Sequence, residues 1–185
     1  LATGSAFMKV SVFNCFILRS GAMSDYGSVL GFNNWNDSLS DRTVANSVIA
    51  GNSASGICSQ NTGYSRARWR IINTAIYGNK NGGGENGYGI DSFTLDDGVL
   101  KAHVFNSILW GNAQEDINIW RNIVFNVDHA DLSRALTEYG AECNQGAGNL
   151  DVDPGFVASG IGNYHLKSSS LLINKGINKG IPQAD

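Results

Sequence analysis

The chain lacks a basic excess, a long apolar run and any metal-type spacing of cysteines. Its 13 Lys and Arg residues stand against 16 Asp and Glu residues, a net charge of −3, which excludes a generic electrostatic binder of nucleic acid. No apolar run approaches the ~20 residues of a membrane-spanning helix, so no membrane span is expected. Cys15, Cys58 and Cys143 include no CxxC pair, which argues against zinc and leaves one disulfide with a free thiol open.

Proline is also scarce, with 2 residues, whereas the chain has 23 glycines and uses asparagine and serine heavily. Gly and Asn tolerate left-handed backbone conformations, so this composition predicts many tight bends between short strands. A hydrophobic content of 42% argues against disorder, and 185 residues form most simply one domain, 1–185. Residues 1–7 precede Met8 and are interpreted as a cloning remnant, or as the residues after a cleaved signal.

A seven-residue pattern with asparagine in third place recurs four times without gaps. The copies are Val12–Leu18, Val44–Ala50, Ile71–Tyr77 and Val104–Trp110, and their asparagines lie 32, 27 and 33 residues apart. The last three copies continue with a Gly-Asn pair, and a weaker fifth copy covers Val124–Asn126. Helical solenoids need longer amphipathic segments than these. A repeat of short β segments therefore predicts a coil of strands, each stacked about 4.8 Å from its equivalent in the next coil.

We accordingly expect an all-β, parallel β-helix with about five coils over residues 8–127 and an irregular C-terminal closing segment over 128–185. Equal residues should stack on equal residues in such a coil. One asparagine ladder is then predicted at the bend and a second at the Gly-Asn pairs; their members are Asn14, Asn46, Asn73 and Asn106, and Asn52, Asn79 and Asn112.

The repeated Asn-Ser-x-Ile-x-x-Gly-Asn block resembles the right-handed parallel β-helix proteins of the pectate-lyase-like superfamily. Residues 146–157 are similar to the closing signature GxGNxxxDPxF of many bacterial members, and residues 163–176 to the DYHLxxxSPxIDxG element after it, with Leu171 and Asn174 in place of the usual Pro and Asp. The resemblance covers residues 10–178 and implies a right-handed β-helix, the C-terminal portion of such a fold. Because the superfamily mixes lyases, hydrolases, epimerases, adhesins and structural repeats, it leaves the function open.

Strand alternation predicts a basic patch on the outside of two neighbouring coils. Arg68 and Lys101 form one outward column, and Arg70 and His103 form the next. Cationic side chains hold uronate carboxylates, arginine bidentately. Arg68 is therefore a candidate for substrate binding, and Arg70, Lys101 and His103 are candidate catalytic residues, since the lyases that the chain resembles pair a neutralising cation with a Lys or Arg base. The alternative is an ordinary solvated strand face.

Two further groups are candidates for binding. Tyr77 and Trp110 should stack on successive coils as a platform for sugar rings, unless a long loop packs over this apolar face. Asp91 and Asn118 should face outward side by side and contribute to a Ca²⁺ site, the one cofactor considered.

These features favour a carbohydrate-binding or surface scaffold module, secreted or on a bacterial cell surface, with an acidic polysaccharide as partner. The alternatives are a polysaccharide lyase or glycoside hydrolase, and a structural part of a larger surface protein without activity. The first coil shows no cap, and an uncapped solenoid end predicts self-association.

Overall fold

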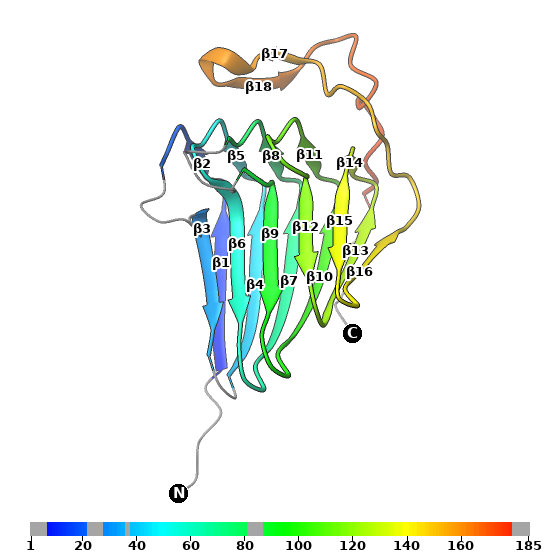
Figure 1. Ribbon diagram of the computed structural model, residues 1–185. Coiled ribbons are helices and arrows are strands. Elements are labelled where there is room, and N and C mark those ends of the chain that lie inside the picture. The colour runs from blue at the N-terminus through cyan, green and yellow to red at the C-terminus, as the bar shows by residue number, and fades with distance from the viewer. Residues whose placement is uncertain (1–6, 22–27, 36–37, 81–86, 179–185) are drawn as a thin grey trace, which may run out of the picture.

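The computed structural model describes residues 7–21, 28–35, 38–80 and 87–178 and shows a parallel β-helix (Figure 1). The expected all-β solenoid is confirmed. In each coil the chain passes through three sheets, which we name A, B and C in the order in which the chain meets them. Residues 1–6, most of the segment interpreted as a cloning remnant, lie outside the described residues.

Sheet A contains the first strand of every coil, in the parallel order β1-β4-β7-β10-β13-β16. Alternation of inward apolar and outward polar residues makes these segments strands. Their bounds are β1 Phe7–Phe13, β4 Leu39–Ala45, β7 Arg66–Ile72, β10 Val99–Phe105, β13 Ile123–Asp128 and β16 Glu142–Gln145.

Sheets B and C each contain five strands, again parallel and in coil order. Sheet B consists of β2 Phe16–Leu18, β5 Val48–Ala50, β8 Ala75–Tyr77, β11 Ile108–Trp110 and β14 Asp131–Leu132. Sheet C consists of β3 Ser28–Asn34, β6 Ser55–Asn61, β9 Ile90–Thr94, β12 Ile117–Trp120 and β15 Ala135–Glu138.

The inward columns of the three sheets form one core in which like side chains stack on like. Val44, Ile71 and Val104 of sheet A meet Ile49, Ile76 and Leu109 of sheet B, all buried. Sheet C contributes Ile57, Ile90 and Ile117, each 0% exposed, and Trp69 and Phe125 fill the space between the sheets. Each of these side chains contributes roughly 1.5–3 kcal/mol on burial, which is why the solenoid can hold its shape without helices.

The bend between sheets A and B depends on asparagine in the left-handed conformation. Asn14, Asn46, Asn73 and Asn106 have φ values of 53°, 51°, 48° and 48°. The ladder predicted at this bend is only partly present, and the asparagine column lies near the surface. Asn73 Nδ2 donates to Asn46 Oδ1 at 3.1 Å, but Asn106 instead bonds the backbone of Ile177, at 2.9 and 3.1 Å. The main role of these asparagines is therefore to adopt the left-handed backbone conformation of the bend, rather than to form hydrogen bonds between coils.

The second predicted ladder is present and buried. Asn52 Nδ2 donates to Asn79 Oδ1 at 2.8 Å, and Asn79 Nδ2 donates to Asn112 Oδ1 at 2.9 Å. Asn112 continues the row to Asp116 Oδ1 at 2.7 Å. Each amide also donates to a backbone carbonyl one coil back, so the ladder satisfies polar groups that the turn would otherwise leave buried and unbonded.

The solenoid continues beyond residue 127, where the sequence placed its end. β14, β15 and β16 complete a fifth coil and begin a sixth, up to Gln145. The weak fifth copy was also misplaced: Asn126 pairs with His103, and His129, with φ 49°, takes the bend position that asparagine holds in earlier coils. Because histidine stands where the earlier coils have asparagine, this bend does not match the sequence repeat.

One inward position of sheet A holds a charge. Arg42 is 1% exposed, and its guanidinium lies 5.0 Å from the centroid of the Phe32 ring. Its Nη2 donates to Asn33 O at 3.2 Å and to Asn34 Oδ1, whereas Nε and Nη1 have no hydrogen-bond partner among the described residues. Burial lowers the pKa of Arg42 to about 10, so the side chain stays charged at neutral pH.

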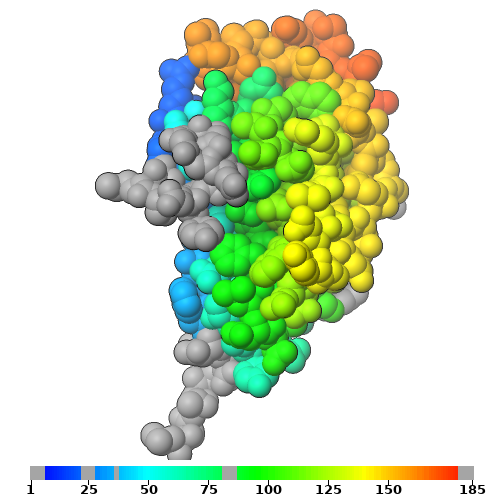
Figure 2. All heavy atoms as spheres, in the orientation of Figure 1, coloured from blue at the N-terminus to red at the C-terminus, as the bar shows by residue number. Residues whose placement is uncertain are grey.

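The chain after Gln145 turns back along the outside of the solenoid (Figure 1). It forms an antiparallel hairpin of β17 (Phe156–Ala158) and β18 (Asn163–Leu166), joined by a 3-10 turn, η1 (Ser159–Ile161). The hairpin lies against the body of the molecule over sheet B (Figure 2). Arg19 Nη2, in the first coil, donates to Gly160 O at 2.6 Å. The closing segment therefore runs along the outside of the solenoid and contacts it at sheet B and at the first coil.

Candidate anion-binding face

The predicted basic columns lie side by side on the outer face of sheet A. Arg68 pairs with Lys101 and Arg70 with His103 in the parallel register of β7 and β10. Arg66, two residues before Arg68, extends the patch along β7 and is exposed. Arg66 was not among the residues predicted from the sequence, although the same alternation places it outward. We call Arg66, Arg68, Arg70 and Lys101 the basic face.

Among the described residues, the four cations of the basic face have no anionic partner. Among the residues that the structure describes, the salt bridge is between His103 and Asp128, and none involves the basic face. Asp41 is in register with Arg68 on β4 but forms no ion pair with it. Like charges on directly neighbouring strand positions are destabilising, so this arrangement costs stability in the free protein. A bound anion would offset that cost.

A hollow opens where the basic face meets the first two coils. It has a volume of about 290 Å³, and Arg66, Arg68 and Lys101 line it together with Asp41. Its apolar walls are Phe7, Leu39 and Val99. The hollow thus presents three cations and one carboxylate beside an apolar surface, which suits an anionic ligand with an apolar side.

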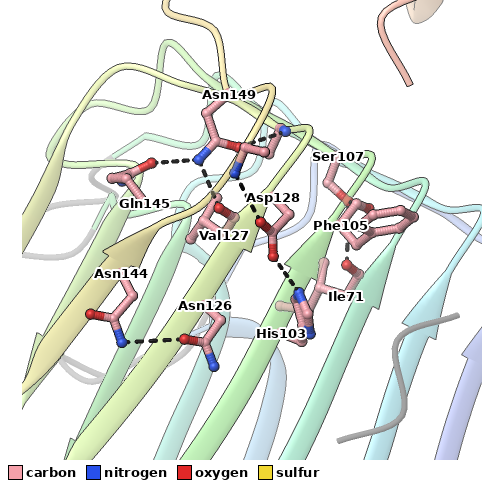
Figure 3. Close-up of polar contacts among 12 residues, drawn as sticks. Ile71, His103, Phe105, Ser107, Asn126, Val127, Asp128, Asn144, Gln145 and Asn149 are labelled. Atoms are coloured by element: carbon pink, nitrogen blue, oxygen red, sulfur yellow. Dashed lines mark hydrogen bonds and ion pairs between the residues drawn. The ribbon is translucent and has the colours of Figure 1, made fainter. Parts of the chain in front are cut away.

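His103 is held in place at the other end of the patch (Figure 3). Its Nε2 lies 2.8 Å from Asp128 Oδ2, and Asp128 Oδ1 accepts from the Ala147 amide at 3.1 Å. Gly146 is required beside this carboxylate, since a Cβ there would lie 1.7 Å from Asp128 Oδ1. Asp128 thus fixes the imidazole of His103, which lies directly opposite Arg70 in the register of β7 and β10. A histidine oriented by a carboxylate can transfer a proton.

Tyr77 and Trp110 are in register on β8 and β11, but the hairpin packs on this column. The Tyr77 ring lies 5.0 Å from the Phe156 ring and 6.0 Å from the Tyr164 ring, both edge to face. Tyr77 and Trp110 are half-buried. For Tyr77 this is the second of the two outcomes that the sequence left open, in which a chain segment covers the apolar face, whereas sugar binding at Trp110 stays a prediction. We leave both residues out of the site.

Asp91 and Asn118 lie side by side on sheet C, where Asn118 Nδ2 donates to Asp91 Oδ1 at 2.9 Å. Burial raises the pKa of Asp91 to about 6. The described residues contain no group of three or more His, Cys, Asp or Glu side chains that could hold a metal ion. Ca²⁺ at this pair stays a prediction.

The sequence left open one disulfide with a free thiol. The structure contains no disulfide among the three cysteines, which are Cys15, Cys58 and Cys143.

Comparison with family models, with curated proteins and with solved structures found no match to this chain. Within the described residues, no helix is both long enough and apolar enough to cross a membrane. Function is therefore inferred from the geometry of the basic face.

Proposed function

We propose that the basic face binds an acidic polysaccharide and that the chain is a carbohydrate-binding β-helix module. The observation that carries the proposal is a group of four adjacent cations that form no ion pair within the described part of the chain, three of which line a hollow of about 290 Å³. Arginine holds carboxylates and sulfates bidentately, so three arginines on one strand favour an anionic ligand.

A polysaccharide fits this face better than a nucleic acid does. The net charge of −3 confines the attraction of either polyanion to this face, so the apolar wall decides between them. Phe7 and Val99 offer an apolar wall against which the C–H face of a sugar ring can pack. Strands that repeat every ~4.8 Å also present side chains periodically, as a polymer of repeating anionic sugars requires.

We also propose membership of the pectate-lyase-like superfamily and a secreted or bacterial cell-surface location. The repeat block and the closing signature, with Gly146 beside Asp128 and Asn149 bonded to Val127 O at 2.7 Å, support this proposal. A scaffold role without ligand binding is the alternative, and retention on polysaccharides distinguishes the two.

A second function is proposed from the position of His103. Arg70 would neutralise a uronate carboxylate and so acidify the neighbouring C–H group. His103, oriented by Asp128 at 2.8 Å, or Lys101 would accept that proton. The electron pair of the C–H bond would form a C=C bond as the C–O bond to the neighbouring sugar breaks, and the leaving oxygen would take a proton from water, which leaves an unsaturated sugar. This reaction would make the protein a polysaccharide lyase.

The experiment compares retention on an immobilised polyuronate with retention on a neutral polysaccharide, for the wild type, Arg68→Ala and Lys101→Ala. Lys167→Ala, which removes an exposed cation outside the face, is the matched control. We expect each basic-face variant to bind the polyuronate about 10-fold more weakly, as the loss of one charge-assisted contact implies, and the control to be unchanged.

Ultraviolet absorbance in the same samples reports unsaturated product. Product that disappears in His103→Ala would establish the lyase, and retention without product would establish a binding module. Equal retention of all variants would overturn the proposal and leave a scaffold role.

A further inference from the structure

A second hollow lies on the outer face of sheet B, where the closing segment after Gln145 runs beside β14 (Figure 1). Its volume is about 170 Å³. Ile108 of β11 and Asp131 of β14 are in register and both line it, so the hollow spans two neighbouring strands. An isolated β-bridge between Asp131 and Leu150 holds the closing segment against β14. The apolar residues that the closing segment adds to the lining are Leu150, Leu166 and Leu172.

Two polar atoms of the residues that line this hollow have no hydrogen-bond partner in the described part of the chain. Asp131 is 3% exposed, and its Oδ1 accepts from the Val152 amide at 3.0 Å, whereas its Oδ2 is buried and unbonded. His129 also lines the hollow, and its Nδ1 is buried and unbonded in the same way. Burial of a polar atom is unfavourable unless a hydrogen bond offsets it. A ligand that bonds both atoms would therefore gain free energy here.

The charges around Asp131 favour a cation as that ligand. Burial, and then the negative charges of Asp151, Asp116 and Asp153, raise the pKa of Asp131 to about 7. A cation bound at Asp131 would lower this pKa again, because it favours the ionised carboxylate. Lys175 also lines the hollow, but it is exposed and forms no ion pair with Asp131 among the residues that the structure describes.

We propose that this hollow binds a small primary amine, with its ammonium group on Asp131 Oδ2 and His129 Nδ1 and its aliphatic body against the leucines of the lining. An ammonium group carries three N–H donors, enough for both atoms. His129 accepts through Nδ1 in the tautomer that carries its proton on Nε2. A hollow of about 170 Å³ with apolar walls suits a chain of a few carbon atoms.

Other cations fit this hollow less well. A guanidinium ion binds both oxygens of a carboxylate side by side, but the Val152 amide already occupies Oδ1 of Asp131. A quaternary ammonium ion has no N–H group to donate to either atom. Ca²⁺ takes about six to eight oxygen ligands, and the described residues contain no group of three or more acidic, His or Cys side chains that could hold a metal ion.

The test is a titration of the full chain with n-butylammonium chloride above pH 7, followed by nuclear magnetic resonance of the backbone amides. NaCl keeps the ionic strength constant. The matched ligands are n-butanol, which lacks the charge, and tetramethylammonium, which lacks the N–H donors. Asp131→Asn removes the carboxylate but keeps an acceptor for the Val152 amide, and Asp97→Asn, at an exposed site, is the control variant. The test uses no polysaccharide, and the basic face lies on sheet A, so the two proposals fail separately.

We expect n-butylammonium to shift the amide signals of Leu150 and Val152 to saturation in the wild type and in Asp97→Asn. Asp131→Asn should bind it about 10-fold more weakly, as the loss of one charge-assisted hydrogen bond implies, and both matched ligands should bind the wild type more weakly by a similar factor. Absence of a shift in the wild type would overturn the proposal, and so would equal binding by Asp131→Asn. Equal binding of n-butanol would also overturn it, because the hollow would then select apolar groups without regard to charge.

Discussion

Asparagine has two separate uses in this chain, and burial distinguishes them. Asn79 is 0% exposed and joins Asn52 to Asn112. Asn79→Leu removes both bonds, and with them the acceptor of the Asn52 backbone amide and one donor to the Ile49 carbonyl oxygen, all within a buried row. We expect it to lower the free energy of unfolding by about 3 kcal/mol, measured by urea denaturation.

Asn73 provides the matched comparison one bend earlier. It is exposed, has φ 48° and makes one side-chain bond, to Asn46. Asn73→Leu should cost about 1–2 kcal/mol, because leucine disfavours this backbone conformation, whereas Asn73→Gly should be nearly neutral. Equal losses for Asn79→Leu and Asn73→Leu would contradict the assignment of bonding to one column and geometry to the other.

Asp131 should make the stability depend on pH. It is 3% exposed, and its pKa is raised from 3.8 to about 7, first by burial and then by the negative charges of Asp151, Asp116 and Asp153. Between these two values the folded chain holds a proton that the unfolded chain has released. Stability contributed by Asp131 is therefore complete below about pH 4 and falls as the pH rises to about 7.

Asp131→Asn should abolish this dependence while its side-chain oxygen still accepts from the Val152 amide. We expect the variant to match the wild type near pH 4 and to exceed its free energy of unfolding by about 2 kcal/mol at pH 7 and above. Urea denaturation across this range measures the difference, and Asp97→Asn, at an exposed site, is the control. A constant difference at all pH values would refute the expectation.

At the scale of elements, the C-terminal hairpin is attached to sheet B mainly by aromatic rings. Phe156 is 8% exposed and lies 5.0 Å from Tyr77 and 5.5 Å from Tyr164, ring to ring. Phe156→Ala should detach the hairpin at a cost of about 3 kcal/mol, seen as faster proteolysis between residues 146 and 178. Ile161→Ala, at a residue that is 82% exposed, should leave the cleavage rate unchanged. Similar rates for both variants would contradict this attachment.

The elements that the sequence predicted correctly are those that repeat. Aligning the asparagines placed Arg70 beside His103, and aligning Ile90 with Ile117 placed Asp91 beside Asn118, because in-register stacking with a two-residue alternation leaves one choice once the register is fixed. The same alternation places Arg66 outward, so Arg66 could also have been predicted as part of the basic face. Spacing along the sequence was sufficient for these residues, since each strand contacts its equivalent one coil away.

Elements outside the repeat could not be predicted in this way. His129 replaces the bend asparagine, so the fifth copy was placed at Asn126, ahead of the true bend. Arg42 occupies an inward column, where charge normally argues for an outward position. The hairpin covers Tyr77 through contacts between residues about 80 positions apart, and no periodicity in the sequence encodes them.

At the scale of the whole molecule, each coil contacts its neighbours only, so stability should vary along the solenoid axis. The middle coils have a neighbour on both sides, and Ile71 and Val104 are 1% and 0% exposed. The first coil has one neighbour, and most of β1 is exposed. We predict that backbone amides of β7 and β10 exchange hydrogen most slowly, and those of β1, β15 and β16 most rapidly.

Hydrogen exchange coupled to mass spectrometry measures this gradient, with equivalent strands of sheet A compared from coil to coil. Equal exchange rates in all coils would contradict the prediction, because they would show that the solenoid opens as one cooperative unit.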